Sequence, residues 1–264
     1  MDAKNDCLKL LDLLGRVLEA NKGTATDREW HAEGLANKFF DHAFFVLYLS
    51  EGSNTLDFPS RPIKISGLAS IDVLTRATFE AFLTFHYVFY IPKTEEDGNY
   101  RYWAYILAGL KDRQNFPAVT DKQKKVFVNE KEAIEELSDK LRSNAKFQDL
   151  NDKQRKKVLK GDWRLKFWRE IAEDADLSKI LASDMYSHLC GFAHSSSLSV
   201  LQIKQAYKKH DEKSLIEPSI IVVNILAANM IREYCELFTQ SKNVLNEDQE
   251  GMNLVDLWIQ IGRG

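Results

Sequence analysis

Apolar residues recur three or four positions apart along almost the whole chain, which is the period of an amphipathic helix. No segment shows the alternation of apolar and polar residues, bounded by turn residues, that is typical of a strand. The pattern predicts an all-α fold, a multi-helix bundle, with the proline-containing segment Leu56–Lys64 as a loop. The predicted helices are Cys7–Ala20, Arg28–Ser50, Ser66–Tyr90, Glu95–Asn115, Asp121–Ser143, Asp152–Lys160, Trp163–Asp174, Leu177–Gly191, Ser197–Lys209, Pro218–Thr239 and Asn253–Ile261.

The length of 264 residues suits either one large helical domain or two closely packed lobes. We predict a single helical domain over residues 1–264. Residues 121–160 are highly charged and carry only sparse apolar positions. A helix of this kind buries little surface, so we expect this segment to protrude as a charged helical hairpin.

Two stripes of polar residues interrupt otherwise apolar helices. One stripe is Asp72, Arg76 and Glu80, and the other is Tyr186, Cys190 and His194. Within each stripe the residues are four positions apart, so a helix places them on one face. The apolar surroundings of the first stripe predict that Arg76 and Glu80 lie in the low dielectric of a core. Buried polar groups need partners, so we expect the two stripes to meet.

The first stripe has two interpretations. Arg76 and Glu80 form either a structural ion pair that fixes helix register, or a site in which Arg76 binds a phosphate or carboxylate while Glu80 orients it.

His194 likewise either is a core histidine with Glu80 or Asp72 as partner, or takes part in acid–base chemistry. His188 lies on a different face from His194. Cys190 and His194 alone are too few ligands for a metal, so we predict no metal site.

The same residues carry a family resemblance. Leu68–Val88 resembles the Arg…Glu helix of an uncharacterised bacterial all-helical family, a domain of unknown function, and Tyr186–Ser196 resembles its second motif. In that motif Cys190 stands where Ser is more usual. The family in turn resembles the HEPN-like bundles of bacterial defence and toxin–antitoxin systems, whose active members are metal-independent RNases. Those enzymes take Arg and His from one helix, four to six residues apart, whereas no Arg in this chain precedes a His at that spacing.

The resemblance implies an RNA, nucleotide or other phosphorylated ligand, a homodimer, and a role in bacterial stress or phage defence. In this interpretation Arg76 holds phosphate, Glu80 orients Arg76 or His194, His194 acts as acid, base or hydrogen-bond donor, and Tyr186 positions one of them. Asp72, Cys190 and Ser196 are the further candidate ligand-binding residues, although serines after a histidine equally suit a helix end and cap.

Residues 151–169 carry eight Lys or Arg against two Asp, with three aromatic residues between them. Basic residues mixed with aromatics are what contact with phosphates and bases requires, which makes Lys156, Lys157 and Arg164 candidate nucleic-acid contacts. The alternative is that Trp163 and Phe167, four residues apart, form the core-facing stripe of a helix and the lysines its solvated face.

Overall charge and cysteine content bear on nucleic-acid binding and on the cellular setting of the protein. The 36 Lys and Arg nearly balance 39 Asp and Glu, giving a net charge of −3, which argues against indiscriminate binding of nucleic acid. The three cysteines form no CxxC pair, which fits a reduced, cytoplasmic setting. We expect no signal peptide, no membrane association and no cofactor.

The interpretation we favour is a binding protein for RNA or a phosphorylated ligand, with enzyme activity left open. The rival is a non-catalytic protein-interaction module, in which both stripes are structural networks and the charged hairpin contacts the partner. Solvent access to Arg76 and His194 favours the first, and a sealed, fully paired cluster favours the second.

Overall fold

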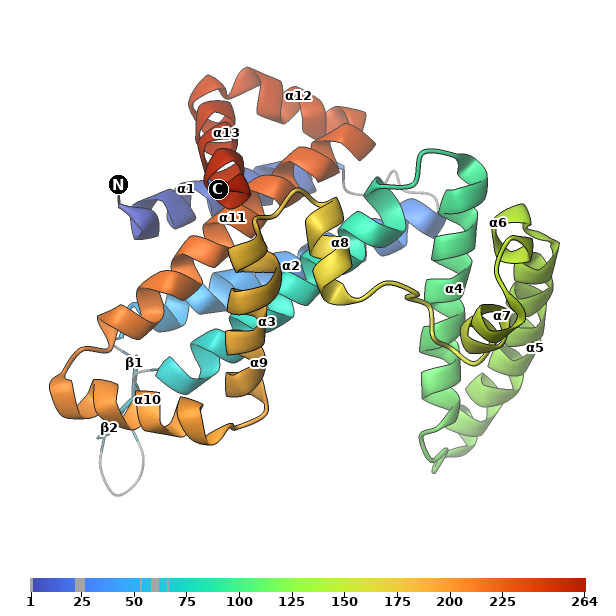
Figure 1. Cartoon of the computed structure of the whole chain (residues 1–264), viewed down its shortest axis with the longest axis horizontal. Helices are drawn as coiled ribbons and strands as arrows, with labels where there is room; N and C mark the ends of the chain where they lie inside the picture. The colour runs from blue at the N-terminus through green and yellow to red at the C-terminus, as the bar shows by residue number, and fades with distance from the viewer. Residues whose placement is uncertain (1, 22–26, 53, 58–61, 66) are drawn as a thin grey trace. The chain divides into compact units, whose positions relative to one another are not determined.

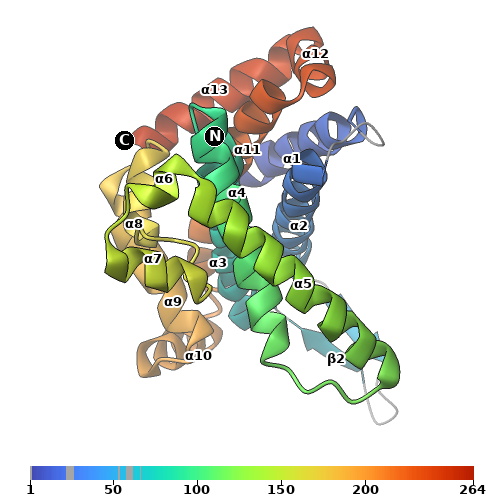
Figure 2. The same cartoon turned by 90° about the vertical axis from the view of Figure 1, so that its right-hand side faces the viewer.

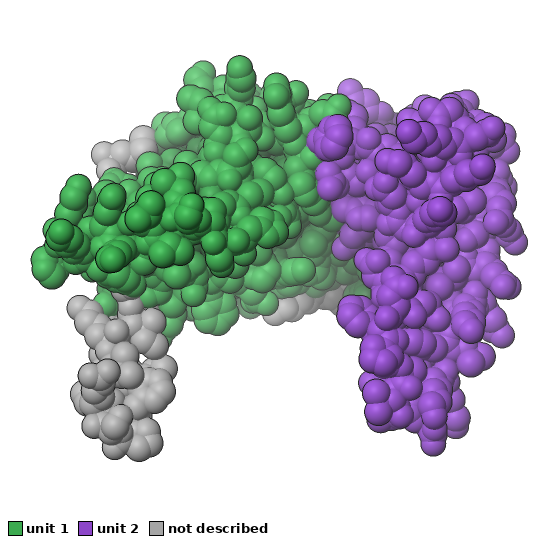
Figure 3. Space-filling model, turned by 60° about the horizontal axis from the view of Figure 1, so that its bottom comes forward, with its two compact units in different colours: residues 1–85, 168–264 green, residues 86–167 purple. Residues whose placement is uncertain are grey.

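A computed structural model describes residues 2–21, 27–52, 54–57, 62–65 and 67–264. The all-α prediction is confirmed: most of the described chain is helical (Figure 1). The chain divides into two compact units, residues 1–85 with 168–264 (unit 1) and residues 86–167 (unit 2), which Figure 3 shows in two colours. The helices of unit 1 are α1 (Ala3–Glu19), α2 (Asp27–Ser50), α3 (Leu68–Phe85), α8 (Trp168–Asp174), the π-helical turn η2 (Ile180–Met185), α9 (Tyr186–Ala193), α10 (Ser197–Lys209), α11 (Lys213–Leu237), α12 (Thr239–Glu247) and α13 (Gln249–Arg263).

The core of unit 1 forms around α11, which contacts α1, α2, α3, α12 and α13. This helix is apolar on nearly all sides, and its buried residues run from Ser219 to Cys235. By length and composition alone it could also cross a membrane, but 61% of its most apolar stretch is buried inside the protein, as in the core helix of a soluble protein. The expectation of no membrane association stays a prediction.

A short antiparallel hairpin corrects the prediction that the chain contains no strand. β1 (Asn54–Asp57) pairs with β2 (Pro62–Ile65), with Asn54 opposite Ile65 and Asp57 opposite Pro62. The predicted loop Leu56–Lys64 overlaps both strands, and its residues 58–61 lie outside the described part. Strands of four residues are too short for a convincing alternation, and Pro62 is tolerated because it is the first residue of its strand.

Several predicted helix boundaries are wrong for local reasons. α1 begins four residues early because the Asp2 carboxylate accepts hydrogen bonds from the backbone N–H groups of Lys4 and Asn5. The helix expected from Trp163 begins only at Trp168. The long helix expected to end at Tyr90 changes from α-helix to a π-helical turn after Phe85.

Unit 2 consists of a π-helical turn and four helices. These elements are η1 (His86–Tyr90), α4 (Glu95–Gln114), α5 (Asp121–Ser143), α6 (Ala145–Gln148) and α7 (Asp152–Leu159). Figure 2 shows α5 running alongside α4, and the two helices are in contact. The apolar core of the unit consists of Tyr100, Ala104, Leu107, Leu141, Phe147 and Val158. Residues 121–160 therefore contribute to a core that they share with α4, while the prediction of a single domain over the whole chain stays a prediction.

Candidate functional site

The two predicted polar stripes lie on α3 and α9, which contact each other within unit 1 (Figure 1). α3 presents Asp72, Arg76 and Glu80 at intervals of one turn. α9 begins at Tyr186 and ends at His194, which caps it. The structure brings Arg76, Glu80, Tyr186 and His194 together, and we call these four residues the α3–α9 cluster.

Glu80 is the central acceptor of the α3–α9 cluster. Its Oε1 atom accepts hydrogen bonds from Arg76 Nε at 3.1 Å and from the Tyr186 hydroxyl at 2.7 Å, and Arg76 Nη2 lies 3.0 Å from the same oxygen. The side chains of Arg76 and Glu80 are 22% and 32% exposed to solvent. The expected low-dielectric surroundings are therefore only partial, because both side chains are long enough to reach solvent from an apolar helix.

His194 approaches the opposite end of the Arg76 guanidinium. Its Nε2 atom lies 3.4 Å from Arg76 Nη1, a long hydrogen bond. Arginine can only donate, so this contact is a hydrogen bond in the tautomer of His194 that carries its proton on Nδ1 and leaves Nε2 to accept. The predicted carboxylate partner of this histidine is wrong, because Glu80 and Asp72 are engaged elsewhere. His194 is exposed to solvent.

The backbone after α9 fixes the position of His194. The His194 N–H donates to the Cys190 carbonyl, and Ser195 adopts a left-handed conformation with φ of 53°. Ser196 then caps α10 by accepting a hydrogen bond from the Ser199 N–H. Ser196, a candidate ligand-binding residue, is therefore already used as a helix cap, and its role in binding stays a prediction.

The electrostatics of the cluster follow from these contacts. Burial and the neighbouring Glu80 carboxylate raise the pKa of Tyr186, so its hydroxyl remains protonated and donates to Glu80. Burial alone would lower the pKa of Arg76, but Tyr186 and Glu80 together raise it. Cys190 is half-buried and close enough to interact electrostatically with both Arg76 and Tyr186. The cluster places the Arg76 guanidinium charge beside the His194 imidazole.

Asp72 belongs to a separate, more deeply buried contact. Its side chain is 3% exposed, and its Oδ1 atom accepts a hydrogen bond of 2.6 Å from the Ser219 hydroxyl on α11. Burial raises the pKa of this carboxyl group, and the Ser219 hydrogen bond and the nearby His188 oppose the rise only in part. His188 is thus close enough to Asp72 to interact with it electrostatically, whereas His194 contacts Arg76. Ser219 was not predicted from the sequence, because it lies in an apolar segment without other polar residues at helical spacing.

The candidate nucleic-acid contacts Lys156, Lys157 and Arg164 lie in unit 2. Lys156 and Lys157 are exposed on α7, and the Lys157 amine lies 3.5 Å from Asp162 Oδ2. Arg164 donates to the Lys166 carbonyl at 2.9 Å. The alternative of a core-facing helical stripe is wrong for Phe167, which is 78% exposed in a segment that is not helical.

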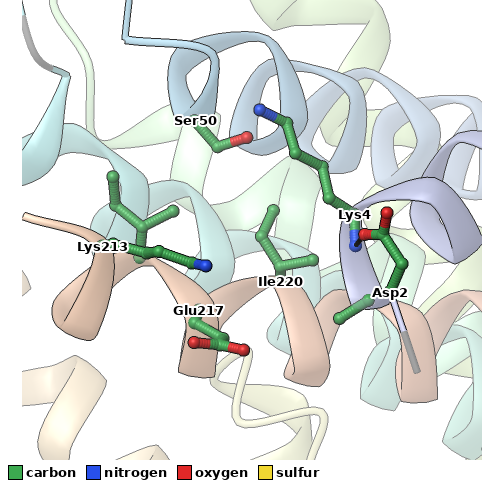
Figure 4. A pocket seen from close by; sticks show the side chains of 8 residues that line it. Asp2, Lys4, Ser50, Lys213, Glu217 and Ile220 are labelled. Carbon is green, nitrogen blue, oxygen red and sulfur yellow. Dashed lines mark hydrogen bonds between the residues drawn. The ribbon is translucent and has the colours of Figure 1, made fainter.

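Three pockets lined by described residues include no residue of the α3–α9 cluster. Figure 4 shows one of about 500 Å³ between α1, α2 and α11, lined by Lys4, Ser50, Lys213 and Glu217 among others. No sequence motif pointed to these residues, because they come from three distant segments. Among the residues that the structure describes, no group of three or more His, Cys, Asp or Glu side chains is placed to hold a metal ion.

Comparison with protein families gives one match. The model of a family of unknown function, DUF5677, matches residues 66–213, more than half of the chain, and this segment contains the whole α3–α9 cluster. Curated proteins and solved structures give no match.

Proposed function

We propose that this chain, which belongs to the family of unknown function DUF5677, binds RNA phosphate groups through Arg76 and His194. One observation carries the proposal: the Nη1 edge of Arg76 and the Nε2 atom of His194 lie 3.4 Å apart, beside solvent. In the HEPN-like resemblance, Arg and His are the residues that act on RNA. Here they come from two helices rather than one, which accounts for the missing Arg–His spacing.

The geometry suits an anion because the guanidinium is fixed on one side and open on the other. Nε and Nη2 are engaged by Glu80 Oε1, which leaves Nη1 directed at His194. A phosphate oxygen beside Nη1 would accept a hydrogen bond from Arg76, and it would also accept one from His194 in the form of the ring that carries a proton on Nε2. Charge-assisted hydrogen bonds of this kind are short and strong.

Cleavage would use the other form of His194, the neutral ring whose Nε2 atom carries no proton. Its Nε2 atom can take the proton of a ribose 2′-hydroxyl as the 2′-oxygen bonds to phosphorus. The bond to the 5′-oxygen then breaks, leaving a 2′,3′-cyclic phosphate and, once that oxygen takes a proton from water, a 5′-hydroxyl. Cleavage of the bound RNA can therefore be measured alongside binding. A role in bacterial stress or phage defence is part of the same proposal.

The rival function is a non-catalytic interaction module. The observation in its favour is that Glu80 already satisfies both Arg76 and Tyr186, a network that would equally serve to hold α9 on α3. In this account His194 is a neighbour of Arg76 without a ligand, and its removal changes stability but no affinity.

The test measures binding of a 5′-labelled 20-nucleotide poly(U) RNA by fluorescence anisotropy, with EDTA present. We expect the wild type to bind and His194→Ala to lose about 10- to 100-fold in affinity, since a hydrogen bond to a charged group contributes about 1.5–3 kcal/mol. His188→Ala is the matched control, because His188 lies on the same helix, where its ring packs against Phe192 and it interacts electrostatically with Asp72. Absence of RNA binding by wild type, or equal losses in both variants at equal stability, would refute the proposal.

A further inference from the structure

The two units differ in the sign of their charge. Unit 2, residues 86–167, contains 18 Lys and Arg against 13 Asp and Glu, whereas unit 1 contains 18 against 26. Unit 2 is therefore basic although the whole chain carries −3. The excess is concentrated at its end, since residues 140–167 hold ten basic and three acidic residues. A local basic surface of this kind attracts polyanions that the net charge alone would not predict.

Part of this charge forms an unneutralised face on α7. Lys153, Lys156 and Lys160 are three and four residues apart, so they lie along one side of the helix, and all three are exposed. In the described residues no carboxylate lies within ion-pair distance of these three amines, whereas Lys157 on the neighbouring side is paired with Asp162. We call these three lysines the α7 face.

A pocket of about 560 Å³ adjoins the α7 face and shares Lys156 with it. Its other charged lining residues are Arg142 of α5 and Arg155 and Asp152 of α7. The two arginines are held in place, since Arg142 Nη1 donates to Asp139 at 2.6 Å and Arg155 Nε donates to the Leu150 carbonyl at 2.7 Å. Arg142 is thus paired with Asp139, and Arg155 Nη1 lies 3.8 Å from Asp152, which leaves Lys156 as the lining cation with no carboxylate within ion-pair distance among the described residues. The apolar wall of the pocket includes the buried Phe147.

We propose that the α7 face and its adjoining pocket form a second contact for RNA, in which the lysines follow the phosphates of a single strand and the pocket receives one phosphate. The choice of RNA among polyanions rests on the proposed function. The lysines are spaced about 4.5–6 Å apart along the helix axis, which lets them contact successive phosphates of one strand. This surface lies on unit 2 and shares no residue with the α3–α9 cluster.

The test compares two triple variants of the full chain. The first removes the α7 face by Lys153→Ala, Lys156→Ala and Lys160→Ala. The matched control is Lys122→Ala, Lys125→Ala and Lys131→Ala on α5, which removes the same charge from exposed lysines of the same unit. Affinity for labelled 20-nucleotide poly(U) RNA is measured between 50 and 300 mM salt (roughly the range over which phosphate contacts weaken).

We expect the α7 variant to bind at least about tenfold more weakly and to lose about 2 from the slope of log affinity against log salt, since each phosphate contact contributes about 0.7 for a single strand. The control keeps the wild-type slope. Equal losses in both triple variants would refute the proposal, because they would show that only net charge matters, and unchanged binding in both would refute it as well.

The same assay separates this proposal from the proposed function. If His194→Ala weakens binding and the α7 variant does not, only the α7 contact is refuted; the reverse result refutes only the role of the α3–α9 cluster. Binding to anionic phosphatidylserine vesicles is measured in parallel. If the α7 variant loses vesicle binding but retains RNA binding, the ligand assignment is wrong.

Discussion

The hydrogen bond between Tyr186 and Glu80 can be removed with little other disturbance. Tyr186→Phe deletes the hydroxyl that donates to Glu80 Oε1 at 2.7 Å and keeps the ring that packs against Phe79, with centroids 5.7 Å apart. A hydrogen bond to a charged acceptor contributes about 1.5–3 kcal/mol, and the 32% exposure of Glu80 lets water replace part of it. We therefore expect a loss of about 1–2 kcal/mol in the free energy of unfolding.

The assay is urea denaturation of the full chain for four proteins: wild type, Tyr186→Phe, Glu80→Gln and the double variant. A loss of about 1 kcal/mol lowers the urea midpoint by roughly 0.5 M at an m-value of about 2 kcal/mol per molar. The double-mutant cycle should give a coupling energy of about 1 kcal/mol, because the amide oxygen of glutamine still accepts the bond but lacks the charge that strengthens it. Tyr48→Phe serves as control, since Tyr48 is 49% exposed and its hydroxyl has no hydrogen-bond partner among the described residues.

A coupling energy near zero would refute this account. It would mean that the charge of Glu80 adds nothing to its bond with the Tyr186 hydroxyl, so that α9 is held on α3 by the other contacts between these helices. His194 would then lack a polar anchor near Arg76, and the geometry behind the proposed function would lose its support.

Three further predictions concern the rest of unit 1 and one helix of unit 2. Burial raises the pKa of Asp72 above its unfolded value, so wild type loses stability as pH rises from about 4 and the carboxyl group ionises. Asp72→Asn has no such group, so the stability of this variant relative to wild type should increase between pH 4 and 7, as measured by urea denaturation. Gly262→Ala should destabilise the protein by about 1–3 kcal/mol, because an added Cβ would lie 2.5 Å from Ile225 Cγ2. Gly109→Ala in α4 is the contrasting variant: its added Cβ meets no atom within 4 Å, so it should stabilise the protein by about 0.5–1 kcal/mol. Thermal denaturation measures both. Cys190 is the half-buried cysteine and should be the one that a thiol reagent modifies in the folded protein, since burial raises the pKa of both others to about 12; rapid modification of a second thiol would contradict this.

Helical spacing was sufficient to bring distant residues of the site together. Arg76 and His194 are 118 positions apart, yet the period of four residues in each stripe placed each of them on a definite helix face. The need of polar groups for partners then predicted that the faces meet. The same reasoning could not predict how open the site is, because exposure depends on where α9 ends, and its end at His194 is decided by the left-handed Ser195 and the Ser196 cap.

Some predictions from local helical spacing were wrong because tertiary contacts determine the conformation of the segment. Trp163 and Phe167 have helical spacing, but Trp163 packs against the rings of Tyr87 and Tyr105 in unit 2 while Phe167 faces solvent. Short elements such as α6 and the β1–β2 hairpin gave no period long enough to detect. Residues 121–160 have few apolar positions, and those few are enough for a core because α4 supplies the facing residues.

The residues covered by the family match differ between two candidate sites, the pocket between α1, α2 and α11 and the α3–α9 cluster. The pocket between α1, α2 and α11 is lined by Asp2, Lys4 and Ser50, which lie outside residues 66–213, and its α11 residues begin only at Lys213, the last residue matched. A property common to members of the family has to be carried by the segment that they share. The α3–α9 cluster and the α7 face both lie wholly within that segment. The family match therefore supports the proposed site at Arg76 and His194 over this pocket. We expect RNA binding to fall when the side chains of Arg76 and His194 are removed and to persist when Lys4 and Ser50 of the pocket are replaced by alanine.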